Sequence, residues 1–306
     1  MNKYKILFHF QPQPTQSQFN SMLKHLTQKE FRKVIQFTQT SNQSNKQNKQ
    51  QSYQNPKCIE YCLMRTLRSQ FYQKYNLNET VNQPNEYGKY DIIDGYQIHY
   101  NWSHDDLVSF IEGPKEVGID IFNCQRFEGK SFSLVYDNIK GFLTVNEQQQ
   151  IESINSNNTN TNDYDSTIDN EINAYLKECM GYGIEEYIPC NQFDDTETIQ
   201  KQRIELFGRI WSCKEAFVKT IGIGLNDIIS TFDIDLQTEI SHLETNRFDT
   251  NCEYTIDISK WFNSVQQYHE KNVYLYCVLI DKKYFCAFGL YDKIDSIVFE
   301  MKDLFR

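Results

Sequence analysis

Residues 211–225 read WSCKEAFVKTIGIGL, and the apolar residues of and before this segment recur at helical spacing, which predicts one long amphipathic helix. Gly222 stands where such a helix would end. Within the helix, Glu215 and Lys219 are four residues apart, so both side chains project from one face. A carboxylate beside an ammonium can hold a divalent cation and an anionic substrate oxygen together. The alternative is an ordinary surface ion pair.

The composition indicates a folded protein without a basic binding face. The chain has 306 residues, of which 39% are hydrophobic, enough for one large core or two smaller ones. Two polar tracts, residues 41–54 and 153–170, have little to bury, and we expect flexible insertions there. The formal net charge of −10 argues against nucleic-acid binding. Any anionic ligand therefore requires a local cluster of Lys, Arg and His.

The cysteines and apolar runs indicate the cellular compartment. Nine cysteines show no C-x-x-C spacing, which favours reduced thiols over a disulfide framework. The N-terminal residues contain only a short apolar run, unlike a secretory signal, and the later run at 273–280 is too short to cross a bilayer. We therefore expect a cytoplasmic protein.

The pattern of periodic segments divides the chain into two comparable halves, residues 1–114 and 115–306. In the first half we expect strands at 4–10, 90–100 and 107–111, and helical patterns over 19–37 and 58–75. In the second half we expect a helix opened by Thr144 and Glu147 at capping-box spacing, the helix of residues 211–221, and strands at 117–121, 231–236, 254–258, 273–280 and 284–290. These elements predict an α+β fold with two lobes, each consisting of helices packed on a small sheet.

Asp120 lies inside the predicted buried strand at 117–121. A buried acid is costly unless a partner compensates for it, and a cation shared with Glu215 would do so. Mg²⁺ suits such a site because it takes one or two carboxylates, keeps waters and completes its shell with substrate phosphates. The alternative is that Asp120 caps a turn at the end of the strand.

Residues 101–104 read Asn-Trp-Ser-His and directly follow a predicted strand. Asn101, Ser103 and His104 together can offer several hydrogen-bond donors to an anion. A histidine in a turn can equally be an ordinary solvated side chain.

Taken in order, these motifs resemble the 4′-phosphopantetheinyl transferases, in particular the larger, pseudo-dimeric class of the surfactin-synthetase-activating and aminoadipate-semialdehyde-dehydrogenase type. The order is N-x-S-H, then V-G-I-D-I, then W-x-x-K-E-A-x-x-K-x-x-G-x-G-L. Phe142, Thr144 and Glu147 match the family's F-x-T-x-x-E, and Gly88-Lys89 matches its G-K-P. The resemblance covers residues 29–290 outside the two polar tracts.

The resemblance implies two similar lobes related by a pseudo-twofold axis, each with an antiparallel-rich sheet, and coenzyme A bound between them. Asp120 and Glu215 would hold Mg²⁺ on its pyrophosphate, and Lys219 would reach the phosphates with help from Lys214. The remaining coenzyme A contacts implied, at the 3′-phosphate and adenosine end, are Asn101, Ser103, His104, Lys89 and either Lys33 or Arg32.

The implied activity is that of a holo-acyl-carrier-protein synthase. A serine hydroxyl of an apo carrier domain attacks the phosphorus bearing pantetheine, and 3′,5′-ADP leaves. Asp120, Glu215 and Lys219 would be catalytic, with Glu215 accepting the serine proton directly or through a metal-bound water. The partners would be carrier domains of fatty-acid, polyketide or peptide synthases or of aminoadipate reductases, and the protein would act as a monomer, without nucleic acid or membrane.

Two positions depart from the family pattern. Phe122 stands where the family often has a second acidic residue, and Tyr90 replaces the proline of G-K-P. The alternatives to an enzyme are a non-catalytic module that binds coenzyme A or a carrier protein, and an interaction protein whose Asn/Gln tracts mediate assembly.

Overall fold

The computed structural model describes residues 3–10, 14–44, 55–77, 98–127, 132–154, 197–224, 227–234 and 239–302. Short 3₁₀ turns connect several of the helices and strands. The helices and strands are, in chain order, β1 (Lys5–Phe10), α1 (Gln16–Leu23), α2 (Gln28–Ser44), α3 (Pro56–Lys74), β2 (His99–His104), β3 (Leu107–Gly113), β4 (Val117–Asn123), α4 (Phe132–Ile139), α5 (Val145–Glu152), α7 (Glu197–Ile221), β5 (Ser241–Leu243), β6 (Glu253–Asp257), β7 (Phe262–Tyr268), β8 (Lys271–Ile280), β9 (Tyr284–Leu290) and β10 (Ser296–Met301).

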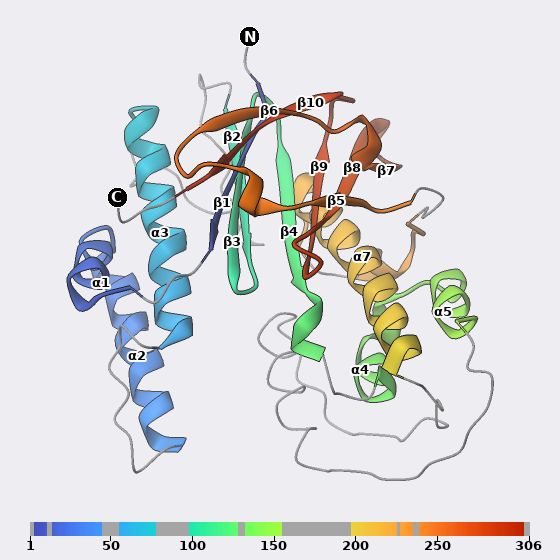
Figure 1. The fold of residues 1–306 in the computed structure, drawn as a ribbon, viewed down its shortest axis with the longest axis horizontal. Helices are drawn as coiled ribbons and strands as arrows, with labels where there is room; N and C mark the ends of the chain where they lie inside the picture. The colour runs from blue at the N-terminus through green and yellow to red at the C-terminus, as the bar shows by residue number, and fades with distance from the viewer. Residues whose placement is uncertain are drawn as a thin grey trace.

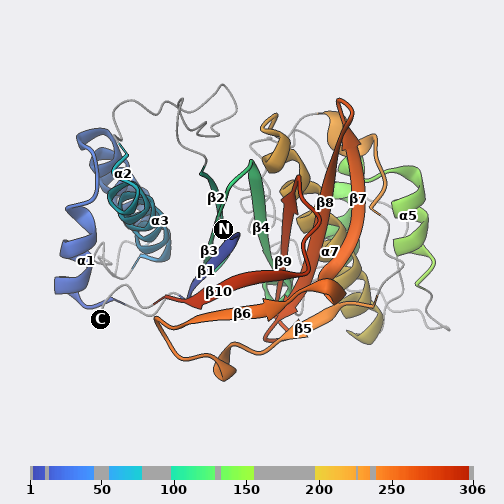
Figure 2. The same ribbon diagram turned by 90° about the horizontal axis from the view of Figure 1, so that it is seen from above.

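Two sheets form the centre of this α+β fold (Figures 1 and 2). The first sheet has the strand order β2-β3-β1-β10-β6, and the second has the order β4-β9-β8-β5, with β7 also pairing with β8. The pairs β1–β10 and β5–β8 are parallel, and the other pairs are antiparallel. Helices α1, α2 and α3 lie beside the first sheet, whereas α7 lies against the second (Figure 2). The edge strands β2 and β4 are therefore neighbours at the middle of the molecule.

Three apolar cores hold these layers together. One lies between α3 and the first sheet and includes Phe71 and Phe110. A second joins the two sheets through residues such as Ile119 of β4, and the third lies beneath α7 and includes Phe207. Because side chains alternate along a strand, the face of β4 opposite Ile119 points toward α7. Asp120 is on that face.

Most of the predicted elements are confirmed, because their apolar periodicity is strong enough to decide helix or strand locally. The confirmed predictions are the strands at 4–10, 107–111, 117–121 and 254–258, the helix at 58–75, the helix after the Thr144–Glu147 capping box, the helix through residues 211–221, and the hairpin of 273–280 and 284–290.

Two predictions differ from the structure. The helical pattern over 19–37 consists of two helices, since α1 ends at Leu23 and α2 begins at Gln28. The strand predicted at 231–236 is wrong for its described part, residues 231–234, which form no strand. There the Ile234 amide donates to the buried Glu147 carboxylate at 2.9 Å, so its hydrogen bond goes to a side chain instead of a neighbouring strand.

The first sheet crosses the expected division at residue 114. Strands β6 and β10 come from the second half of the chain, yet β10 pairs with β1, where Ile6 is aligned with Phe299. The first and last strands of the fold thus lie side by side. The polar tracts lie largely outside the described residues, although α2 continues to Ser44.

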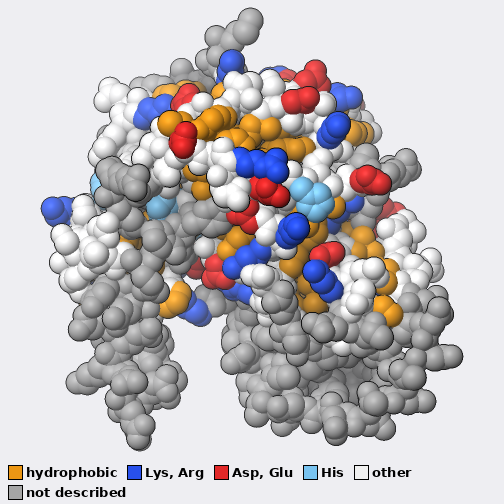
Figure 3. All heavy atoms as spheres, viewed as in Figure 1, with side chains coloured by type: hydrophobic (Ala, Val, Ile, Leu, Met, Phe, Trp, Pro, Cys, Tyr) orange, Lys and Arg blue, Asp and Glu red, His pale blue; other side chains and the backbone are white. Residues whose placement is uncertain are grey.

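On the face drawn in Figure 3, Lys and Arg side chains are interspersed with Asp and Glu rather than gathered together. None of the helices in the described part of the chain has both the length and the apolar character needed to cross a membrane. The cysteines found among those residues are free thiols.

Candidate active site

The last two turns of α7 carry Glu215 and Lys219, and the helix ends where the sequence predicts. Gly222 has a φ of 77°, in the left-handed region that glycine adopts without strain. The amides of Gly222 and Ile223 both donate to the carbonyl of Val218, at 2.9 and 3.3 Å. This termination places Lys219 in the last turn, where the helix dipole favours a positive charge.

A close contact between α7 and β4 brings Asp120 to this end of the helix. A Cβ atom on Gly118 would lie 2.2 Å from the carbonyl oxygen of Ala216, so only glycine permits the strand and the helix to approach this closely. Asp120 is two residues further along β4 and therefore lies on the same face as Gly118.

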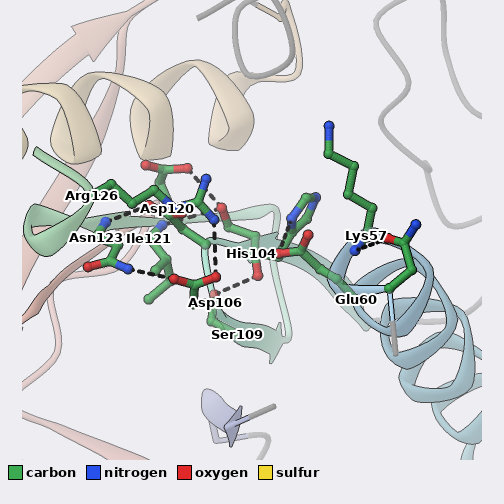
Figure 4. Close-up of polar contacts among 12 residues, drawn as sticks. Lys57, Glu60, His104, Asp106, Ser109, Asp120, Ile121, Asn123 and Arg126 are labelled. Atoms are coloured by element: carbon green, nitrogen blue, oxygen red, sulfur yellow. Dashed lines mark hydrogen bonds and ion pairs between the residues drawn. The ribbon is translucent and has the colours of Figure 1, made fainter. Parts of the chain in front are cut away.

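Two side chains from separate segments, Lys219 of α7 and Ser103 of β2, meet at Asp120. Lys219 Nζ lies 2.7 Å from Asp120 Oδ1 and 3.2 Å from Ser103 Oγ. Ser103 Oγ also donates to Asp120 Oδ1, at 2.9 Å. Asp120 is 5% exposed, whereas 27% of the Lys219 side chain remains exposed, so the ammonium can contact a ligand. In Figure 4, Asp120 lies beside the end of α7.

Glu215 interacts electrostatically with Lys219 and Asp120. Glu215 is buried, and this burial raises the pKa of its carboxyl to about 8. The positive charge of Lys219 lowers the pKa of Glu215, and the negative charge of Asp120 raises it. Two carboxylates and one ammonium therefore interact at one place, and Glu215 holds its proton at neutral pH in the absence of a further cation.

The donor set fits a magnesium ion held by two carboxylates. Asp120 Oδ2 is buried and has no hydrogen-bond partner, which is unfavourable unless a cation binds there. Mg²⁺ takes oxygen ligands and is typically held by one or two carboxylates together with waters and phosphates. Within the described ranges, no group of three or more His, Cys, Asp or Glu side chains could hold a metal ion. The two residues predicted to hold the metal, Asp120 and Glu215, are both buried carboxylates that interact electrostatically.

Phe122, at the position of the family's second acid, belongs to the core beneath α7. Its ring stacks on Phe127 at a centroid distance of 5.4 Å and meets Phe207 edge-on at 5.6 Å. A Cβ on Gly208 would lie 2.5 Å from the Phe122 ring, so the glycine on α7 makes room for the phenyl group. Position 122 therefore contributes apolar packing and no oxygen ligand.

Residues 182–279 match the family model described as the 4′-phosphopantetheinyl transferase superfamily. The match covers about a third of the chain. The matched range contains Glu215 and Lys219 but not Asp120 or Ser103, which the fold brings to Lys219 from β4 and β2. No curated protein matches the chain.

The remaining residues predicted to bind coenzyme A lie in different surroundings. Ser103 belongs to the group of Asp120, Ser103, Lys219 and Glu215, which we call the Asp120 cluster. Asn101 accepts from the Ile119 amide of β4 at 3.3 Å. His104 points to the opposite side of β2, toward α3, where its Nδ1 lies 2.7 Å from Glu60 Oε1 (Figure 4). Ser103 and His104 are adjacent in sequence but face different elements because strand side chains alternate.

The predicted cations of the first half are only partly described. Lys33 and Arg32 are exposed residues of α2, and Lys33 Nζ lies 5.3 Å from the ring centroid of Tyr61 on α3. Lys89 lies outside the described residues.

Lys214 is not brought to the Asp120 cluster. Its fully buried ammonium lies 2.8 Å from Glu147 Oε2 and donates to the carbonyls of Ile229 and Phe232 at 2.6 and 2.7 Å. Glu147 Oε2 also accepts from the Thr144 amide of the capping box. Lys214 thus joins α7 to the start of α5 and to residues 229–232, and its donors are used within the protein.

Ion pairs that were not predicted from the sequence join α2 to α3. Glu30 of α2 accepts from Arg65 and Arg68 of α3, at 2.8 and 2.7 Å. Arg65 also lies over the rings of Tyr61 and Trp102, at 4.6 and 5.7 Å from their centroids. The three-residue spacing of the two arginines on one helical face was the available signal.

Proposed function

We propose that this protein is a holo-acyl-carrier-protein synthase, which transfers 4′-phosphopantetheine from coenzyme A to a serine of an apo carrier domain in a Mg²⁺-dependent reaction. The observation that carries this proposal is the Asp120 cluster: Asp120 and Ser103 contact Lys219 of α7, the helix whose Glu215 and Lys219 lie in the superfamily domain. Phosphoryl transfer requires mainly positioning and charge stabilisation, which such a cluster supplies.

Asp120 and Glu215 would hold Mg²⁺, which when bound neutralises charge on the diphosphate oxygens. Asp120 Oδ2 offers a buried oxygen without a hydrogen-bond partner, and Glu215 offers a second buried carboxylate that interacts electrostatically with Asp120. Lys219 is partly exposed and already next to Asp120, so its ammonium stabilises the charge that develops on the leaving phosphate oxygen.

In the reaction, a bond forms between the carrier serine Oγ and the phosphorus that bears pantetheine, and the bond from that phosphorus to the oxygen of 3′,5′-ADP breaks. Glu215 accepts the serine proton in this scheme. Burial raises the pKa of Glu215 to about 8 in the metal-free site, and a cation bound beside it would lower this pKa, so that the carboxylate is free to accept a proton near neutral pH.

The coenzyme A nucleotide is proposed to lie on the α2–α3 side of β2. His104 is 41% exposed there, and we assign it with a cation of α2, either Lys33 or Arg32, to the 3′-phosphate and adenosine end. Asn101 faces β4 and Lys89 lies outside the described residues, so their part in binding the nucleotide stays a prediction. Lys214 is left out because its ammonium is fully buried in contacts within the protein.

We further propose that the protein acts in the cytoplasm as a monomer with two pseudo-twofold-related lobes, on carrier domains of fatty-acid, polyketide or peptide synthases or of aminoadipate reductases. The second candidate function is a non-catalytic module that binds coenzyme A or a carrier protein. The aromatic Phe122 in place of a third carboxylate favours this alternative.

Transfer of a fluorescent pantetheine from a coenzyme A analogue to a panel of apo carrier proteins, with Mg²⁺ or with EDTA, separates the two functions. We expect labelling of a carrier serine with Mg²⁺ and its loss with EDTA. Binding of coenzyme A without labelling of any carrier would reject the transferase in favour of the binding module.

A further inference from the structure

The two sheets meet at β2 and β4 without a backbone ladder. β2 is the edge of the first sheet and β4 the edge of the second, both strands are fully described, and no strand pairing joins them. An edge strand presents unpaired N–H groups that need acceptors when they are buried. The way in which β4 satisfies these groups determines where Asp120 is held.

Three side chains of the β2 segment supply those acceptors at two-residue spacing. The amides of β4 residues 119, 121 and 123 donate to Asn101 Oδ1, Ser103 Oγ and Asp105 Oδ2, at 3.3, 3.3 and 2.5 Å. We call these three contacts the side-chain ladder. Because alternate residues of a strand point to one side, the ladder replaces a backbone pairing and fixes the register between the two sheets.

Asp105 closes the ladder at the end of β4. It is 3% exposed, and its Oδ1 lies 2.5 Å from Nε of Arg126, which follows β4 in the chain. The neighbouring Asp106, held at a φ of 60°, accepts from the Asn123 side chain at 2.8 Å and from Arg126 at 3.3 Å (Figure 4). The turn after β2 is thereby fastened to the end of β4 by several contacts.

The middle rung of the ladder reaches the Asp120 cluster directly. Ser103 Oγ accepts from the Ile121 amide and also contacts Asp120 Oδ1 and Lys219 Nζ. A change in the register or separation of β2 and β4 must therefore move the Asp120 carboxylate relative to α7. The outer rungs at Asn101 and Asp105 resist such a change from both sides.

We propose that Asp105 is a positioning residue, which holds the Asp120 carboxylate in its metal-binding position through the side-chain ladder. This inference rests on the proposed function, since it assigns Asp120 the role of a metal ligand. Asp105 itself is separated from the ligands by Asn123 and Ser103, so it acts through β4 and not on the substrate.

The test compares Asp105→Ala, Asp105→Asn and Glu300→Gln in the full-length protein. Glu300 is a matched control: it is also a buried carboxylate, and it pairs with Lys5 and Lys302 near β1 and β10 and not with the ladder. Mn²⁺ affinity is measured by electron paramagnetic resonance without coenzyme A or carrier. The transfer assay then gives kcat and KM separately.

We expect Asp105→Ala to weaken Mn²⁺ binding by about tenfold or more, as removal of a group that orients a metal ligand does. Asp105→Asn should weaken it less, since its amide oxygen can still accept from Asn123. Glu300→Gln should leave it unchanged. The transfer rate of Asp105→Ala should fall in kcat, with the KM for coenzyme A within about twofold of the wild-type value, because the ladder holds a metal ligand rather than the nucleotide.

Wild-type Mn²⁺ affinity in Asp105→Ala, or an equal loss in Glu300→Gln, would overturn the positioning role. If Asp105→Ala does not fold, Asn101→Ala at the other end of the ladder and Asp105→Asn decide the question by the same metal titration. Absence of transfer by the wild-type protein would instead reject the proposed function, and the Mn²⁺ comparison would still decide whether Asp105 positions the carboxylates.

Discussion

Glu215 illustrates how burial prepares a single side chain for chemistry. Its carboxyl is removed from water next to Asp120, and this burial raises its pKa to about 8, even though Lys219 opposes the shift. An isolated buried charge is strongly unfavourable, so the site binds either a proton or another cation. The protein therefore keeps the Glu215 carboxyl buried at a cost in stability that depends on pH.

The first prediction concerns this pH dependence in metal-free protein. Since the folded-state pKa of Glu215 lies above the unfolded value, the folded state binds more protons between pH 4.5 and about pH 8. The free energy of unfolding of the wild type should fall relative to that of Glu215→Gln as the pH rises through this window, by at most about 1.4 kcal/mol per pH unit.

Urea denaturation in EDTA at several pH values between 5 and 8.5 measures this difference. Asp105, whose pKa burial raises to about 7, titrates in both proteins and cancels in the comparison. Parallel stability curves for the wild type and Glu215→Gln would show that Glu215 is not buried as described.

The second prediction concerns activity. Glu215→Gln and Asp120→Asn should each lower kcat/KM for pantetheine transfer by about 100-fold or more, because each removes a charge that holds the metal. Glu205→Gln, on the same helix but away from the cluster, is the matched control and should stay within about threefold of the wild type, as expected for a position outside the reacting charges. Circular dichroism checks that the variants are folded, and near-normal turnover of either cluster variant would reject the metal assignment.

At the level of elements, the contact between α7 and β4 is the decisive one. Gly118 lets the two backbones approach, and Gly208 makes room for the Phe122 ring between the helix and the strand. The helix is thereby held on the strand at two points, with Asp120 between them in the sequence of β4. A rigid pair of elements positions charged groups more accurately than two loops would.

The third prediction follows from this contact. Gly118→Ala should destabilise the protein by about 1–3 kcal/mol or more, since the added methyl group would force α7 away from β4. The same shift should reduce transfer, because Lys219 would move away from Asp120. Gly141→Ala is the control, since a Cβ there meets no atom within 4 Å. Thermal unfolding of both variants gives the comparison, and equal stabilities would contradict the close approach.

The fourth prediction separates a structural from a ligand-binding role for Lys214. Lys214→Met should lower the free energy of unfolding by about 3–5 kcal/mol, because it leaves the Glu147 carboxylate buried without its counter-ion. The KM for coenzyme A of the folded fraction should stay close to the wild-type value. A large rise in this KM with unchanged stability would show that Lys214 contacts the phosphates after all.

For the whole molecule, the sequence predicts local features better than contacts between distant segments. The end of α7 at Gly222 and the capping box at Thr144 depend on a few neighbouring residues, and both are confirmed. The pairing of β10 with β1 joins the two ends of the chain, and no local pattern indicates it.

In the candidate site, too, local features could be predicted better than contacts between distant segments. The prediction of one group containing Asp120 and Glu215 depended on their chemistry, since two carboxylates and a lysine suit a metal and a phosphate. Strand alternation alone could have indicated that Ser103 and His104 face opposite sides of β2. The partner of Asp105 could not be predicted, because it requires knowing that two unpaired edge strands lie side by side.

The most direct test of the account is an anomalous-scattering map of crystals grown with Mn²⁺ and coenzyme A. We expect one manganese peak between the Asp120 and Glu215 carboxylates, in contact with the diphosphate, with Lys219 beside the same phosphates. A diphosphate and manganese bound elsewhere, with the two carboxylates making no contact with the ion, would contradict it.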